Sequence, residues 1–313
     1  MNVSGIVLNQ VIVMFLLVLI GFLVVRANII TQKVNRGMCD LLLKIVIPFS
    51  IVNAYFQSYS VERTRQLGMA FLLSVVFHIL SIVLSSLMFR KSDKQDYRID
   101  RIGVVYSNCG FMGLPLLFAV FGEDGVFFGS AYIAVFNVLL WIHGIKTMKP
   151  EQKLGVGKIL FNPGVIAIAV GLISYFFQIQ YPDAIVQTVR HVSNINTPLA
   201  MVVIGGFFVS VKIKGNVTNL RNIAVAMTRV LILPLIFIGF LLIAQAAAWS
   251  EPNRVVALAM VVAAACPTAA AVVLLPESVG IDSKQGSTIL ALTTILSIVT
   301  LPLVTLIAGL FLL

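Results

Sequence analysis

Ten apolar runs, each long enough to cross a lipid bilayer, occupy almost the whole chain, and no other feature constrains the fold as much. They are residues 5–25, 37–57, 67–89, 102–121, 125–145, 158–178, 192–211, 222–248, 254–275 and 287–312. A helix crosses the hydrocarbon core in roughly 20 residues. The gaps between the runs are too short for a separate soluble domain. The sequence therefore predicts an all-α polytopic membrane protein with ten transmembrane helices.

Composition and charge exclude several other classes of protein. Of the 313 residues 59% are hydrophobic and 11% are charged, whereas about 25% are charged in soluble domains. The net charge of +10 is spread over short gaps and does not form one basic face, so no nucleic-acid partner is expected. Cys39, Cys109 and Cys266 lie far apart without paired spacing, which indicates small core residues and neither a metal site nor a disulfide framework.

The basic residues are distributed unequally between the gaps. The odd-numbered gaps hold sixteen of the 22 Lys and Arg residues and the even-numbered gaps hold four, namely Arg63, Arg65, Arg190 and Arg254. Because loops rich in Lys and Arg stay in the cytoplasm, this asymmetry predicts cytoplasmic odd-numbered loops. The chain is then a multi-pass protein of the cell membrane with both termini extracellular. The first run has no basic residues before it, so we expect it to remain as a spanning helix.

An internal repeat relates the two halves of the chain. Gly21 and Pro48 match Gly171 and Pro198 at a common offset of 150 residues, and SNCGFMGLPLL (107–117) has a counterpart in AACPTAAAVVLLPE (264–277). Five spans per repeat force the second copy to enter from the opposite side, as in many secondary transporters. We therefore predict a first repeat at 1–145, a cytoplasmic connecting loop at 146–157 and a second, inverted repeat at 158–313. Chance similarity between apolar sequences is the alternative.

Spans four and nine each carry residues that interrupt helices. Gly110, Gly113 and Pro115 lie within six residues, and Pro267 stands in span nine. Proline lacks an N–H and opposes the carbonyl four residues earlier, so we expect span four to break between Asn108 and Pro115. Inside a bilayer an irregular backbone is tolerated where it is buried in protein or lines a cavity. The alternative is a pair of kinked structural helices.

The two breaks form the predicted substrate site. Each would present free helix-terminal amides, which attract anions by about 0.3–1 kcal/mol each. The Asn108 amide could donate to a carboxylate, with Ser107 and Asn137 nearby, and the Thr268 hydroxyl could serve a freed carbonyl or a ligand. No metal or cofactor is expected. The candidate substrate-binding residues are Asn108, Cys109, Gly110, Met112, Gly113, Pro115, Asn137, Pro267 and Thr268.

Several charged or titratable residues fall inside or beside the spans. Arg229 lies eight residues beyond Arg221 in span eight and is either a substrate or gating charge or a side chain that reaches back to the headgroups. Asp40 and Lys44 have the i,i+4 spacing of a helical ion pair, structural or gating. The histidines, His78 and His143, could titrate with a coupling proton or serve packing.

The sequence resembles the auxin efflux carrier family, which includes plant PIN proteins and bacterial permeases. NCGFMGLPLLFAVFG (108–122) is similar to the crossover motif of the family's fourth helix, and TILALTTILSIVTLPLVTLIAGL (288–310) to its last helix. The resemblance implies a scaffold of spans 1, 2, 6 and 7 beside a transporter domain of spans 3–5 and 8–10, with broken helices 4 and 9 crossing and an elevator-type movement. Asn108, Met112, Gly113, Pro115 and Pro267 would fall at that crossover.

These observations favour a secondary transporter for a small organic anion, such as malate, malonate or an auxin-like acid. The sequence lacks the long cytoplasmic loop of many plant members and has alanines at 269–271, so auxin is not favoured over other acids. A channel or a ligand-sensing receptor of the same fold is the alternative. An intramembrane enzyme is disfavoured because the chain contains no HExxH or GxSxG motif. Expected partners are the anion and the lipid bilayer, with a homodimer left open.

Overall fold

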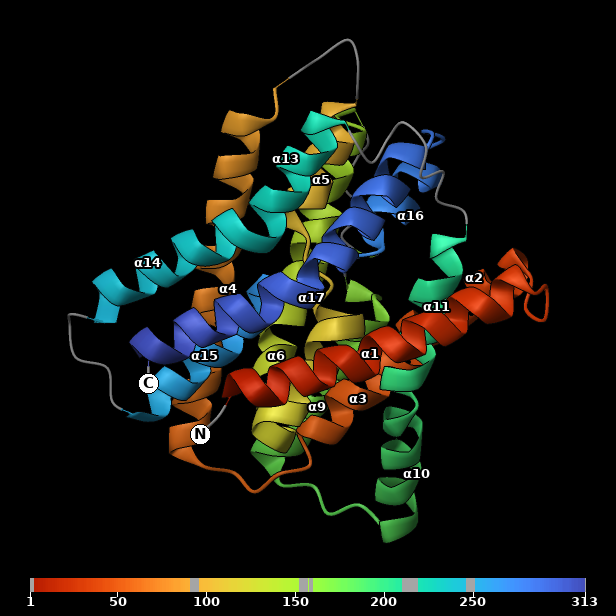
Figure 1. Ribbon diagram of the computed structural model, residues 1–313. Coiled ribbons are helices and arrows are strands. Elements are labelled where there is room, and N and C mark those ends of the chain that lie inside the picture. Colours follow the sequence, from red (N-terminus) through yellow and green to blue (C-terminus); the bar gives the residue numbers. More distant parts are fainter. Residues whose placement is uncertain are drawn as a thin grey trace.

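The computed structural model describes residues 3–90, 96–151, 157, 160–209, 219–245 and 251–312 (Figure 1). All named elements in these residues are helices, including four π-helical stretches called η. In the first half they are α1 (Val3–Arg26), α2 (Gln32–Leu41), η1 (Leu42–Val46), α3 (Ile47–Ala54), α4 (Val61–Met88), α5 (Tyr97–Val105), η2 (Cys109–Gly113), α6 (Leu114–Leu139), η3 (Leu140–Gly144) and α7 (Ile145–Met148). In the second half they are α9 (Pro163–Phe177), α10 (Asp183–Asn194), α11 (Asn196–Phe208), α13 (Leu220–Met227), η4 (Thr228–Ile232), α14 (Leu233–Gln245), α15 (Glu251–Ala265), α16 (Ala271–Ser278) and α17 (Lys284–Leu312).

Six helices in the described residues are long and apolar enough to cross a membrane. One of them, Cys109–Met148, contains most of two predicted spans, which join at a kink at Gly122, where the backbone leaves the helical conformation with a φ of 63° that suits glycine. Two shorter apolar helices, α9 and Asn253–Ala265, overlap predicted spans six and nine. The polytopic all-helical class is therefore confirmed.

Residues 152–156 of the predicted connecting loop and both terminal residues lie outside the described part of the chain.

The helices pack in two groups, which meet where α1 lies against α17 and where α6 lies against α1, α3 and α9 (Figure 1). In one group α1 lies against α11, and α3 packs against α9 and α10. In the other, α4 packs against α5 and α15, while α17 contacts α13, α15 and α16. Helix α10 lies in a gap that we expected to be a loop. It is short and mostly exposed. A search for apolar runs long enough to span a bilayer does not detect a helix of this kind.

Helices α1 and α11 approach each other closely because glycines face each other across the contact. A Cβ on Gly21 would overlap the backbone oxygen of Val202, and a Cβ on Gly205 would overlap that of Val18. Small residues that allow backbones to approach are the usual means of helix association in a bilayer. The glycine at position 21, found as one half of the repeat match, is therefore a packing residue.

The predicted position of the break in span four is wrong by a few residues. Helix α5 ends at Val105 and η2 begins at Cys109, so the break is at 106–108 and Pro115 lies inside the following helix. The π-helical turn explains this, because its wider ring accommodates a proline two residues later. The same arrangement occurs where η1 precedes Pro48 and where η4 precedes Pro234.

A cluster of polar side chains joins the ends of α5, α13 and α17. Asp100 is fully buried and accepts hydrogen bonds from Arg221 Nε and Gln285 Nε2, both at 2.6 Å. Asp96, at the N-cap of α5, pairs with Arg98 at 2.6 Å. Burial acts to raise the pKa of Asp96, but the hydrogen bonds from Arg98 outweigh it and hold the pKa below its usual value. The cluster fixes these three helices to one another at one end.

We expect Asp100→Ala to lower the thermal unfolding midpoint of the purified protein by about 5–10 °C. The substitution removes the buried carboxylate to which Arg221 Nε and Gln285 Nε2 donate, which costs about 3 kcal/mol for a largely buried pair. Asp282→Ala is the matched control, because the Asp282–Lys284 side chains are 62% and 72% exposed; its midpoint should move by about 1 °C or less. Equal shifts for the two variants would show that the buried cluster adds nothing to stability.

Candidate functional site at the crossing of two broken helices

The interrupted segments of spans four and nine cross and hydrogen-bond to each other. Ser107 and Thr268 form an isolated antiparallel bridge. The backbone N–H of Asn108 donates to the Pro267 carbonyl at 2.7 Å, and the backbone N–H of Ala269 donates to the Tyr106 carbonyl at 2.9 Å. Each break therefore satisfies backbone groups of the other, which is how an irregular backbone becomes tolerable inside a membrane protein.

Side-chain hydroxyls complete the hydrogen bonding around the crossing. Thr268 Oγ1 donates to the Gly103 carbonyl at 2.7 Å, so it serves a carbonyl near the end of α5. The Thr268 amide donates to Thr293 Oγ1 at 3.2 Å. Ser107 Oγ donates to Tyr132 Oη at 2.9 Å. Thr293 and Tyr132 escaped the sequence analysis because a polar residue in an apolar span gives no sign of which segment it faces.

Arg229 lies at the crossing and has no exposed surface. Its guanidinium donates to the carbonyls of Val104 at 2.9 Å and Val105 at 3.4 Å, and to that of Cys266 at 3.2 Å. It also donates to the carbonyl of Ala264. Of the two alternatives for Arg229, the one in which its side chain reaches the headgroups is wrong, because the carbonyls at the ends of α5 and α15 bind it in the interior.

Asn108 is the one candidate site residue with a buried side-chain donor that has no partner among the described residues. It is 4% exposed, and its Nδ2 has no hydrogen-bond partner in that part of the chain. A buried amide without an acceptor costs about 1–3 kcal/mol. The crossing therefore presents an N–H₂ group that a ligand oxygen could satisfy.

The second half-helix of span four begins next to Asn108. The first N–H groups of a helix have no partner within it, and here those groups belong to Cys109, Gly110 and Phe111. Gly110 is half-buried, and the nearest side-chain atom to a Cβ there is Ile47 Cδ1 of α3 at 3.1 Å. The start of η2 thus faces the other group of helices.

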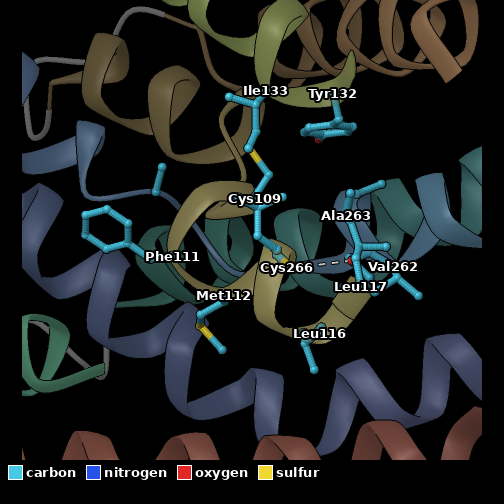
Figure 2. Packing of buried hydrophobic residues seen from close by; sticks show 14 of the residues in the cluster. Cys109, Phe111, Met112, Leu116, Leu117, Tyr132, Ile133, Val262, Ala263 and Cys266 are labelled. Atoms are coloured by element: carbon cyan, nitrogen blue, oxygen red, sulfur yellow. Dashed lines mark hydrogen bonds between the residues drawn. The ribbon is translucent and has the colours of Figure 1, made fainter. Parts of the chain in front are cut away.

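The apolar residues of the crossing pack tightly (Figure 2). Cys109 and Cys266, from the two broken segments, lie side by side; a Cβ on Gly113 would be 3.4 Å from Cys109 Cβ and 3.5 Å from Cys266 Sγ. Both are free thiols. Met112 is fully buried. These residues shape the crossing, and Asn108 supplies its unused polar group.

Other predicted site residues lie elsewhere. Asn137 is half-buried against the start of α9, where a Cβ on Gly164 would be 2.7 Å from its Nδ2. Asp40 and Lys44 form the expected i,i+4 ion pair at 2.9 Å, with both side chains mostly exposed.

Two histidines also have defined surroundings. His143 Nδ1 lies 3.0 Å from Tyr106 Oη. His78 is fully buried, with Nδ1 2.7 Å from the Ser74 carbonyl. Among the described residues, no three His, Cys, Asp or Glu side chains lie close enough together to hold a metal ion.

The described residues form helices, several of them of bilayer length, and two interrupted helices cross in their interior, which are the features of a multi-pass membrane protein. A family model described as "Membrane transport protein" matches residues 6–159 and 153–305. The chain belongs to this family, which is the auxin efflux carrier family that the sequence motif resembles. Membership implies a transport role.

One relative among curated proteins is an uncharacterized transporter of Methanocaldococcus jannaschii. The two sequences are 22% identical over 209 residues, which cover 63% of this chain and 68% of the relative. This similarity agrees with the family assignment and adds no substrate.

Proposed function

We propose that this protein is a secondary carrier that moves a small organic anion across the cell membrane, with a carboxylate bound at the crossing of spans four and nine. The observation that carries the proposal is the buried Asn108 amide, whose Nδ2 has no acceptor among the described residues. The start of η2, next to Asn108, adds the positive end of a helix dipole. Neutral donors can bind a carboxylate and still release it.

We further propose that the ten spans form two inverted repeats, and a pair of equivalent contacts supports this. Gly21 of span one faces Gly205 of span seven. At the repeat offset of 150 residues, Gly21 corresponds to Gly171 in the second half, and Gly205 corresponds to Tyr55 in the first half. Gly171 and Tyr55 are also in contact, since a Cβ on Gly171 would be 2.8 Å from Tyr55 Cγ. Contacts that interchange in this way are expected when two halves are related by a two-fold axis in the membrane plane.

The proposed movement is of elevator type, with a scaffold of spans 1, 2, 6 and 7 and a mobile domain of spans 3–5 and 8–10. Among the described residues, polar contacts between the two groups include Arg36–Glu277 at 3.4 Å and Asn53–Glu123 at 3.3 Å. The first is between largely exposed or half-buried side chains and is therefore weak. A third contact, between Tyr55 Oη and Ser130 Oγ at 2.8 Å, is buried, so the proposed sliding of one domain past the other would have to break it.

The test is ligand-dependent thermal stabilisation of the purified protein, because a ligand that binds the native state raises its stability. The panel contains malate, malonate, succinate, citrate and indole-3-acetate, with chloride at matched ionic strength as the reference. We expect one class of carboxylate to raise the unfolding midpoint in a saturable manner, and the effect to weaken in Asn108→Ala. The acid that binds then becomes the substrate in a proteoliposome flux assay.

Three outcomes would argue against the proposal. A well-folded protein that responds to no acid would remove the anion assignment. Saturable stabilisation that is unchanged in Asn108→Ala would place the anion away from the crossing. A flux of many ions per protein per second without counterflow would favour a channel over a carrier.

A further inference from the structure

The positive charge of Arg229 is balanced by helix ends. Among the described residues, the ion pairs formed involve other basic side chains and no carboxylate lies in ion-pair contact with Arg229. Its N–H groups donate to the carbonyl of Val104, near the C-terminal end of α5. They also donate to the carbonyls of Ala264, in the last turn of α15, and Cys266, just beyond that helix. The C-terminal end of a helix carries roughly −0.5 elementary charge. Two such ends together balance about one guanidinium.

Carbonyl groups of this kind are the usual site of a coupling cation. In transporters with discontinuous helices, unwound carbonyls and the C-terminal ends of half-helices coordinate Na⁺ or a proton. Here the oxygens of Val104, Ala264 and Cys266 accept hydrogen bonds from Arg229. The guanidinium also lies over the Phe77 ring, with Cζ 5.4 Å from the ring centroid.

We propose that the guanidinium of Arg229, tethered to the chain, takes the position of a coupling cation at this crossing. The protein then works without sodium there. Truncating the Arg229 side chain exposes a binding site for a free monovalent cation. The proposal deepens the proposed carrier function and rests on it for the statement about transport. The statement about the cation site concerns the fold and can be measured without any substrate.

The experiment compares thermal unfolding of the wild type, Arg229→Ala and Arg229→Lys in about 0.15 M sodium, potassium or choline chloride, with guanidinium added up to about 20 mM. Arg101→Ala is the matched control. Arg101 also donates to backbone carbonyls, those of Phe89 at 3.0 Å and Ser86 at 3.3 Å, but its side chain is half-buried and water can replace it.

We expect the wild-type midpoint to be the same in sodium, potassium and choline. Arg229→Ala should lose about 10 °C, since it leaves several buried carbonyls without a donor. Guanidinium or sodium, and not choline, should restore at least about a third of that loss with a saturable dependence. Arg229→Lys should lose less and respond to no added cation. Arg101→Ala should change little and show no saturable response.

Three results would overturn the proposal: a wild-type midpoint or flux that requires sodium, an Arg229→Ala variant that no small cation stabilises, or an Arg229→Lys variant that responds to cations as Arg229→Ala does. If Arg229→Ala yields no folded protein, the wild-type and Arg229→Lys arms decide the question. Loss of the carboxylate response with retention of the cation response would contradict the proposed function alone, so the two failures can be told apart.

Discussion

Asn108→Asp is expected to raise the dissociation constant of the bound carboxylate by at least about 100-fold, equivalent to about 2.7 kcal/mol. The replacement keeps the shape of the side chain but exchanges the unused Nδ2 donor for an oxygen that carries negative charge. A like charge facing the ligand costs several kcal/mol. The measurement is a titration of thermal stabilisation or of binding heat with the acid identified from the panel.

The matched control for this variant is Asn162→Asp. Asn162 is the N-cap of α9, where its Oδ1 accepts from the Gly164 amide at 2.9 Å, and aspartate caps a helix equally well. It introduces the same charge away from the crossing, so the dissociation constant should change by less than about twofold. An Asn108→Asp protein that binds the acid as the wild type does would remove Asn108 from the site.

Gly21→Ala is expected to lower the unfolding midpoint by about 10 °C. The added Cβ would overlap the Val202 backbone, which cannot rotate away as a side chain can, so α1 and α11 must separate along their contact. Overpacking of this kind costs about 3 kcal/mol. The midpoint is measured by thermal unfolding in detergent, and Gly205→Ala, which meets the backbone of α1, should behave in the same way.

Gly68→Ala provides the comparison for the glycine variants. Gly68 lies on α4, and a Cβ there meets nothing within 4 Å. Alanine in an exposed helix is more favourable than glycine by about 0.5–1 kcal/mol, so this variant should be as stable as the wild type or slightly more. If Gly21→Ala were equally harmless, α1 and α11 would not be packed as closely as the structure places them.

The apolar runs were enough to predict the class of protein and the approximate extent of most helices. Hydropathy is summed over about 20 residues, so it survives local irregularity. The glycines and prolines marked the right segments, and NCGFMGLPLLFAVFG identified the family. The position of the break was less accurate, because Pro115 can be placed either at a break or behind a π-helical turn, and sequence alone does not distinguish the two.

What the tertiary structure decided is which groups meet at the crossing. The sequence showed Arg229 as a charge inside a span, whereas the fold places it against Val104, 125 residues earlier, and Cys266, 37 residues later. It also separated Asn137 from Asn108 by turning the former toward α9. The physical reason is that these partners are backbone carbonyls, which every residue carries. A sequence can show that a buried cation needs acceptors, but which carbonyls accept from it is determined by the positions of the helices.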